Sequence, residues 1–309
     1  MYQHSWNPLN SRNVRNVIVC LLITQTPVLA QPAEPLFAID NLMAWCIVPF
    51  DATKRTPHQR AEMLKRLGIG KLAYDYRAEH VPSFETEILA LKQNGIELTA
   101  WWFPTTLTDE AKLILRLLGK HKVKTQLWVT GGGGPTENKT KQQLRVSAEA
   151  NRIRLIAEAA AKVNCKVGLY NHGGWFGEPE NQIAIIRHLK LPNVGVVYNQ
   201  HHGHGHVDRF PELLQKMRPH LYAINLNGMS RGGDKAGAKI LPIGAGELDL
   251  ELLKSIQASG YRGPIGILNH TQQDAEARLS DNLAGLAWVR GQIDGADPKP
   301  RPEYQTWRK

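Results

Sequence analysis

The sequence predicts a single (β/α)8 TIM barrel, and three features of the chain lead to this fold class. Short apolar runs alternate with segments of helical periodicity eight times between residues 36 and 293. The 309 residues accommodate one barrel of roughly 250 residues. Two of the runs, 167–170 and 194–198, stop at amides and imidazoles, as expected where parallel strands deliver polar side chains to one rim. Strict alternation favours a closed barrel over a doubly wound sheet.

Eight strands are expected where short runs are rich in β-branched, aromatic and other apolar residues. In chain order these runs cover residues 42–48, 71–74, 97–102, 124–129, 167–170, 194–198, 221–226 and 264–268.

The segments between the runs carry helix signals. The first helix is expected to begin after Thr56, whose hydroxyl suits an N-cap, and to stop at Gly68. The eight expected helices cover residues 57–67, 83–93, 108–121, 139–163, 179–188, 209–217, 248–258 and 274–292.

The first 30 residues differ from the barrel and predict a cleavable signal peptide. Arg12 and Arg15 precede an apolar run at 17–23, and Ala30 fits the small-residue cleavage rule. The run is too short to span a membrane permanently. We therefore expect a periplasmic or secreted protein with no stable membrane span after cleavage.

Composition and charge limit the classes of partner. The net charge is +10 and the hydrophobic fraction is 42%, which suffices for a large core. No basic run is interleaved with aromatic residues, so nucleic acid is not an expected partner.

Cys46 and Cys165 lie in or beside predicted buried strands, so no disulfide framework is implied. Residues 294–309, rich in proline and charge, predict a surface strap or a disordered tail. Nothing in the sequence sets the oligomeric state.

Amide, imidazole and aromatic side chains gather where the predicted strands end. Four of the 12 histidines lie within residues 201–206. Amides pair with vicinal hydroxyls and aromatic faces cover apolar C–H patches, so we expect a small-molecule carbohydrate as the ligand. The expected substrate-binding residues are Arg77, Trp102, Trp128, Asn171, Trp175, Asn199, His201, Asn225, Asn227, Asn269 and His270.

Four rim residues are candidates for proton transfer, namely His202, His172, Asp75 and His204. Imidazole suits this role because its unperturbed pKa is about 6.5. Each histidine could instead hydrogen-bond its neighbours and fix the shape of a loop. The glycine-rich segment 228–246 is expected either to close over the pocket as a lid or to remain an exposed connection.

Several short motifs together resemble the xylose-isomerase-like TIM barrels. They are the turns Asn171-His172-Gly173 and Asn199-Gln200-His201-His202, the run at 244–249, and the run at 260–264. That superfamily includes sugar phosphate isomerases and epimerases, inosose dehydratases and endonuclease-IV-like enzymes. The resemblance covers residues 40–292 and implies a sugar isomerase or epimerase that abstracts a proton next to a carbonyl. Together with the predicted signal peptide, it leads us to expect an exported enzyme. Two alternatives remain open: a lyase or hydratase of keto-sugars, and a non-catalytic carbohydrate-binding barrel.

The resemblance also implies a divalent metal site, from which this chain departs. The family holds its metal with carboxylates and histidines on strands five to eight. Those positions fall on Tyr170, Asn199, His202, Asn225, and Leu268 or Asn269. Only His202 keeps the expected residue type. A divalent metal at this site would be Zn²⁺, Mn²⁺, Co²⁺ or Ni²⁺, with His202 among its ligands.

Overall fold

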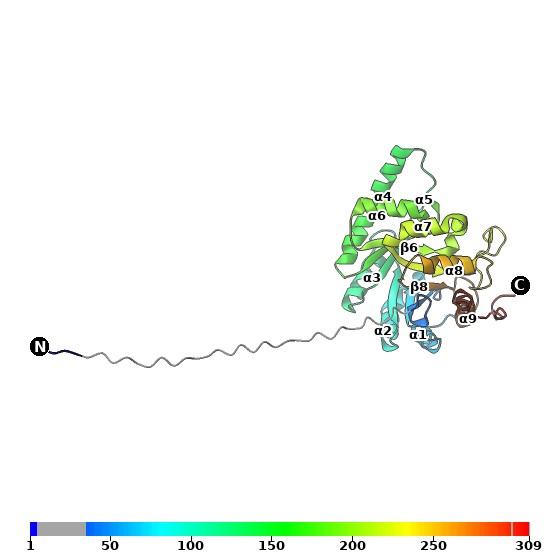
Figure 1. Ribbon diagram of the computed structural model, residues 1–309, viewed down its shortest axis with the longest axis horizontal. Coiled ribbons are helices and arrows are strands. Elements are labelled where there is room, and N and C mark those ends of the chain that lie inside the picture. The colour runs from blue at the N-terminus through cyan, green and yellow to red at the C-terminus, as the bar shows by residue number, and fades with distance from the viewer. Residues whose placement is uncertain (5–34, 298, 309) are drawn as a thin grey trace. The chain divides into compact units, whose positions relative to one another are not determined.

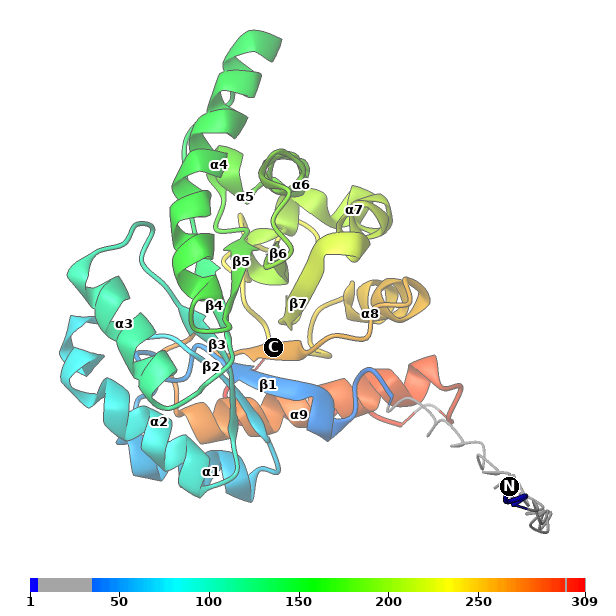
Figure 2. The same cartoon turned by 90° about the vertical axis from the view of Figure 1, so that its left-hand side faces the viewer.

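A closed barrel of eight parallel strands forms the centre of the protein (Figures 1 and 2). The computed structural model describes residues 1–4, 35–297 and 299–308. Each strand pairs with the next, and Leu42 of the first strand pairs with Ile265 of the last. The predicted TIM barrel is confirmed. The strands are β1 (Leu42–Trp45), β2 (Lys71–Tyr74), β3 (Glu97–Trp102), β4 (Gln126–Val129), β5 (Lys166–Tyr170), β6 (Val194–Asn199), β7 (Leu221–Leu226) and β8 (Ile265–Leu268).

Helices alternate with the strands and lie outside the barrel (Figure 2). Thr56 caps the first of them as predicted, since its hydroxyl accepts from the Gln59 N–H in a capping box. The α-helices are α1 (Pro57–Arg66), α2 (Phe84–Gln93), α3 (Asp109–Lys120), α4 (Lys139–Ala161), α5 (Gly174–Gly177), α6 (Pro179–Leu189), α7 (Phe210–Met217), α8 (Asp249–Ala258) and α9 (Ala275–Ile293). Short 3-10 helices cover Ile39–Asn41, Ala78–Ser83, Gln200–His202, His204–Arg209 and Arg218–His220.

The first strand is shorter than the sequence predicts. β1 ends at Trp45 rather than at residue 48, because Cys46 has a φ of +59° and turns the chain out of the extended conformation. The apolar character of residues 46–48 therefore reflects burial at the rim of the barrel rather than a continuing strand.

Aromatic side chains fill the interior of the barrel. The Trp45 and Trp128 rings meet edge to face with centroids 4.7 Å apart, and Tyr170 packs 5.6 Å from Trp128. Small residues on the facing strands, Ala73 and Ala100, make room for these rings. The barrel is a packed core whose polar chemistry is confined to its ends.

The C-terminal segment is an ordered strap on α9. The Tyr304 hydroxyl donates to the Ile243 carbonyl at 2.9 Å, and the backbone N–H groups of Gln305 and Thr306 donate to the Asp281 carboxylate.

The predicted signal peptide falls almost wholly on residues 5–34, outside the described residues. Within the described ranges, no helix is long and apolar enough to cross a membrane. Cys46 and Cys165 are free and buried.

Candidate active site

A pocket opens at the rim formed by the C-terminal ends of the strands. The cavity measures about 50 Å³, which holds a few water molecules, so a sugar would also occupy its open mouth. Its lining joins charged, imidazole and aromatic side chains from opposite sides of the barrel. The lining residues are Trp45, Cys46, Phe50, Asp75, Arg77, Trp102, Tyr170, His172, His202 and His270.

Asp75 is the one carboxylate among these lining residues, and it follows β2 directly. Its side chain is buried, and Oδ1 accepts a 3.4 Å hydrogen bond from the Val48 N–H. Oδ2 has no hydrogen-bond partner among the described residues. Burial raises the pKa of Asp75 to about 7, although the Arg77 guanidinium acts in the opposite direction. A carboxyl with one free oxygen and a near-neutral pKa is suited to proton transfer.

A chain of imidazoles forms the facing wall. The His172 and His202 ring centroids lie 4.5 Å apart, His202 and His201 lie 4.0 Å apart, and His201 and His270 lie 5.2 Å apart. Burial, with smaller contributions from the neighbouring imidazoles and from Lys239, lowers the pKa of His201 to about 2 and that of His202 to about 3. These rings are neutral near pH 7, where each can donate one N–H hydrogen bond and accept another.

Arg77 and Phe50 form the edge of the pocket next to Asp75. The Arg77 guanidinium lies 5.2 Å from the centroid of the Phe50 ring, and it donates to the Tyr76 carbonyl at 2.7 Å. Phe50 in turn packs against His270, with centroids 4.0 Å apart. Cys46 lies beneath this edge, where burial and then the Asp75 charge raise its thiol pKa. It therefore remains a protonated thiol at neutral pH.

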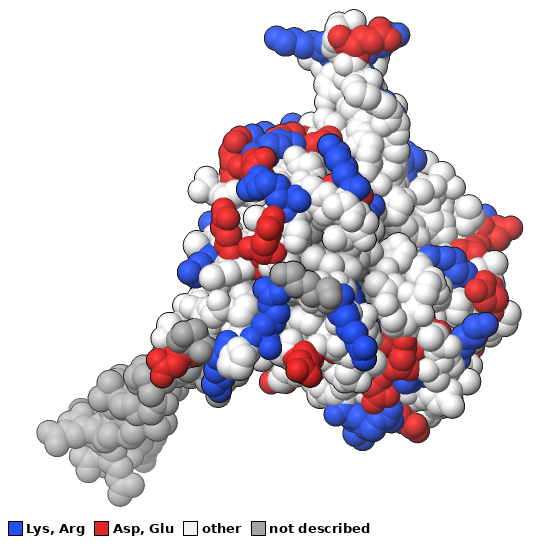
Figure 3. Space-filling model, turned by 90° about the vertical axis from the view of Figure 1, so that its right-hand side faces the viewer, with Lys and Arg blue, Asp and Glu red and all other residues white. Residues whose placement is uncertain are grey.

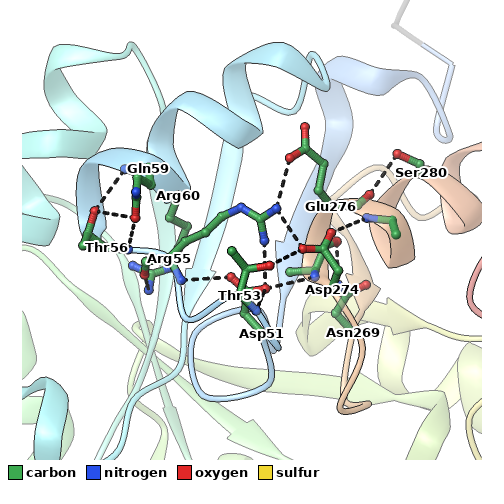
Figure 4. Close-up of polar contacts among 12 residues, drawn as sticks. Asp51, Thr53, Arg55, Thr56, Gln59, Arg60, Asn269, Asp274, Glu276 and Ser280 are labelled. Atoms are coloured by element: carbon green, nitrogen blue, oxygen red, sulfur yellow. Dashed lines mark hydrogen bonds and ion pairs between the residues drawn. The ribbon is translucent and has the colours of Figure 1, made fainter.

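A polar network fixes the loops that carry Phe50 and His270 (Figure 4). The Arg55 guanidinium donates to Asp51 at 2.8 Å and to Asp274 at 2.9 Å, which joins the loop after β1 to the start of α9. Asp51 also accepts from the backbone N–H of Ala275 at 3.1 Å. Because these groups are bonded to one another and are not among the lining residues, they position the wall of the pocket.

The glycine-rich segment 228–246 lies beside the pocket. Its two ends pair at Gly228 and Leu241, and Ile240 packs against the aromatic cluster inside the barrel. His204 contacts the Lys239 carbonyl through Nε2 at 2.9 Å. This loop, called the lid loop below, therefore borders the pocket without contributing a lining residue. His204, a candidate for proton transfer, holds the loop instead of lining the pocket.

The predicted asparagines share the rim but not the pocket lining. Asn171 bonds twice to the backbone of Asn199, and the Asn199 amide donates to the Tyr170 hydroxyl. Asn269 donates to the Ala275 carbonyl, and Asn227 bonds to the backbone of the lid loop. Both polar atoms of the buried Asn225 lack a partner among the described residues. Most of these amides therefore tie neighbouring strands and loops together.

Two predicted tryptophans are also outside the pocket lining. The Trp128 indole N–H donates to Gln126 inside the barrel, and that of Trp175 donates to Gln142 of α4 at 2.6 Å. Asp75, Arg77, Trp102, His172, His202 and His270 do line the pocket, with His201 directly behind it. Three further lining residues were not predicted from the sequence, namely Trp45, Cys46 and Phe50. Trp45 and Cys46 lie within the first apolar run and Phe50 lies two residues beyond it.

The donor set does not fit the divalent metal of the resembled family. The Tyr170 hydroxyl accepts from the Trp45 indole at 3.1 Å and from the Asn199 amide, and Leu268 is a buried apolar side chain. Among the described residues, no three His, Cys, Asp or Glu side chains are arranged to hold a metal ion. His202 alone of the expected ligand positions offers a suitable donor to the pocket.

Residues 94–290 match the family model of the xylose isomerase-like TIM barrel. The chain belongs to this family. No protein of curated function matches the xylose isomerase-like barrel described here.

Several solved structures share the fold at low sequence identity. The 3-keto-D-glucoside 4-epimerase from E. coli has a TM-score of 0.58 and 16% identity, covering 81% of this chain and 99% of its own. The probable 3-DHS dehydratase from Bacillus anthracis has a TM-score of 0.60 and 17% identity, with coverage of 80% and 98%. A protein named IOLI, solved with a zinc atom, has a TM-score of 0.64 and 13% identity, with coverage of 82% and 98%. At these identities the likeness shows the fold alone.

Proposed function

We propose that this xylose isomerase-like barrel is a carbohydrate isomerase or epimerase that uses Asp75 to move a proton next to a carbonyl. The observation that carries the proposal is the free Oδ2 of Asp75 at the pocket, on a carboxyl whose pKa is raised by burial to about 7. The family and the sugar-active names of two similar structures, 3-keto-D-glucoside 4-epimerase and D-psicose 3-epimerase, support the substrate class.

In the proposed reaction, Asp75 Oδ2 takes the proton from the carbon adjacent to the carbonyl. The electron pair of the broken C–H bond forms the enolate, and the negative charge moves to the carbonyl oxygen. A neutral imidazole with its N–H toward that oxygen, as His202 can present, stabilises the charge by a hydrogen bond. Asp75 then returns the proton to the former carbonyl carbon while the hydroxyl proton of the adjacent carbon passes to the enolate oxygen, so that carbonyl and hydroxyl exchange places and the sugar is isomerised. Protonation of the carbon that lost its proton, from the other face and by a second group, would instead produce an epimer.

Among the four candidates for proton transfer, the pKa values favour Asp75 over His202 as the proton acceptor. An imidazole whose pKa is about 3 is a poor base near neutrality, whereas a carboxyl of pKa about 7 is half ionised there. The same enolate could expel a neighbouring hydroxyl, which is the reaction of the lyase alternative. The name of one similar structure, a probable dehydratase, supports this alternative.

The test is a screen of neutral, acidic and keto sugars by thermal shift, since a bound ligand raises the apparent stability of the folded chain. Each hit is then incubated in D₂O with the wild type and with Asp75→Asn. We expect the wild type to place deuterium on the carbon next to the carbonyl, and the variant to bind without exchange. Binding without exchange by the wild type would favour the non-catalytic barrel, while loss of water from the sugar would favour the lyase.

We also propose that the protein is exported, on the basis of Arg12, Arg15, the apolar run at 17–23 and Ala30. Protein recovered from the native cell envelope or medium should begin near residue 31. An intact Met1 terminus on that material would contradict export.

A further inference from the structure

We propose that the substrate is a sugar acid, and that Arg77 and Lys239 bind its carboxylate. This inference rests on the proposed function for its site and names the substrate class. The bound group would sit at the mouth of the pocket, between the β2 edge and the lid loop.

The first support is the balance of charge around the pocket. On the face shown in Figure 3, acidic and basic side chains are interspersed. The pocket lining is different, because it contains one guanidinium, three imidazoles and one carboxyl that is half protonated near pH 7. A site with so little negative charge around cationic groups favours an anionic ligand.

The second support is the position of Lys239 in the lid loop. Its backbone carbonyl is held by the His204 ring and by the Asn227 amide at 3.2 Å, so the residue is fixed over the rim. Burial is the largest cause of the lowered pKa of His172, His201, His202 and His270, and the positive charge of Lys239 lowers each of them further. The positive charge of Lys239 thus acts on all four imidazoles, although the residue is exposed and is not among those that line the pocket.

The third support is that neither cation forms an ion pair with a carboxylate of the described residues, although the charge of Arg77 lowers the pKa of the nearby Asp75. Neither Arg77 nor Lys239 makes an ion pair within 4.0 Å with any residue that the structure describes. Arg55, by contrast, is saturated by Asp51, Asp274 and Glu276. Packing on Phe50 and the bond to the Tyr76 carbonyl fix the Arg77 guanidinium while leaving further N–H donors available. A planar carboxylate is a suitable acceptor for such donors.

A carboxylate, rather than a phosphate, is the anion that this arrangement favours. The imidazoles are neutral near pH 7, so Arg77 and Lys239 supply two positive charges, and the ionised form of Asp75 offsets one of them. A carboxylate carries the single negative charge that balances the remainder, and it leaves the carbonyl end of the sugar to reach Asp75 in the narrow pocket beneath. A sugar phosphate has a larger group with nearly two charges at neutral pH.

The test uses the full chain and isothermal titration with D-glucuronate and D-galacturonate, compared with D-glucose, D-galactose and D-glucose 6-phosphate. We expect at least one uronate to bind ten-fold or more tightly than its neutral sugar, and affinity to fall as salt is added. Arg77→Met and Lys239→Met should each weaken uronate binding by about ten-fold or more. Lys235→Met, at an exposed position of the same loop, is the matched control and should leave affinity unchanged.

Each other outcome overturns the inference. Equal binding of neutral sugars, tighter binding of the phosphate, absence of uronate binding, or unchanged affinity in both variants would contradict it. The proposed function fails separately: a uronate that binds through Arg77 and Lys239 without deuterium exchange leaves the inference standing and removes the reaction. Deuterium exchange on a neutral keto-sugar that neither variant changes would support the reaction and contradict the inference.

Discussion

The two sides of the barrel rim use their polar residues in opposite ways. On the side of β5 to β8, Asn171, Asn199 and Asn269 are bonded to the backbone or side chains of neighbouring elements. On the side of β1 and β2, Asp75 keeps a free oxygen and Arg77 keeps free donors at the pocket. The resembled family would place metal ligands on the first side. In this chain most of those positions stabilise the barrel, whereas His202 lines the pocket. The carboxyl of Asp75 and the guanidinium of Arg77 lie across from the imidazoles of this side.

The largest expected effect is on turnover when Asp75 is changed to Asn. If Asp75 accepts the proton, the variant should lose about 10³-fold in the rate of deuterium exchange, within the usual range for a general base. The wild-type rate should rise with pH through an apparent pKa of about 7, since the ionised carboxylate is the base. Measured rates between pH 5 and 9 check both points. A fully active Asp75→Asn variant would show that Asp75 is not the proton acceptor and would favour one of the imidazoles instead.

The second prediction concerns the stability of the same two proteins. The pKa of Asp75 is about 7 in the folded chain and near 3.9 in an unfolded one, so the folded state binds this proton more tightly. Its contribution to stability is present at low pH and is lost as the pH rises from about 4 to about 7. Relative to the wild type, Asp75→Asn should gain up to about 4 kcal/mol between pH 4 and pH 8. Urea unfolding at both pH values measures the gain, and equal pH dependence would show a normal carboxyl.

A smaller loss is expected for His202→Leu, which removes an N–H donor from the facing wall. Turnover should fall by about 10²-fold, the scale of losing one donor to a developing oxyanion. The pH profile between 5 and 8 should keep its shape, because burial holds the pKa of His202 at about 3. His220→Leu, at a histidine outside the pocket, serves as the control. A changed profile in His202→Leu would make His202 the titrating base.

The smallest effect is expected for Asn199→Asp, which restores a carboxylate at a position where the family has a metal ligand. Asn199 is fully buried and donates to Tyr170, so the change should cost about 1–3 kcal/mol of stability. It should not create tight Mn²⁺ binding, because Tyr170 and Leu268 still occupy two other ligand positions. Calorimetric titration with Mn²⁺ checks this prediction, and micromolar binding would show that the family's ligand geometry survives.

The fold was more predictable from the sequence than the site. Apolar runs and caps such as Thr56 depend on local spacing, and they placed the strands and most helices within a few residues. The direction of a side chain at the rim depends on tertiary contacts, which the sequence does not show. Asn171 and His172 are neighbours, yet the first bonds across strands and the second lines the pocket. The turn at Cys46 likewise depends on a positive φ, and a cysteine at this position does not predict that backbone conformation.

The most direct test is a carbon-13 NMR titration of aspartate carboxyl groups in the full chain. Two buried carboxyls, Asp75 and Asp249, have pKa values raised by burial to about 7, so two resonances should titrate near pH 7. Asp75→Asn should remove one of them and Asp249→Asn the other, and a bound sugar should shift only the Asp75 resonance. A resonance of Asp75 that titrates near pH 4, or that ignores the ligand, would contradict its role as the proton acceptor.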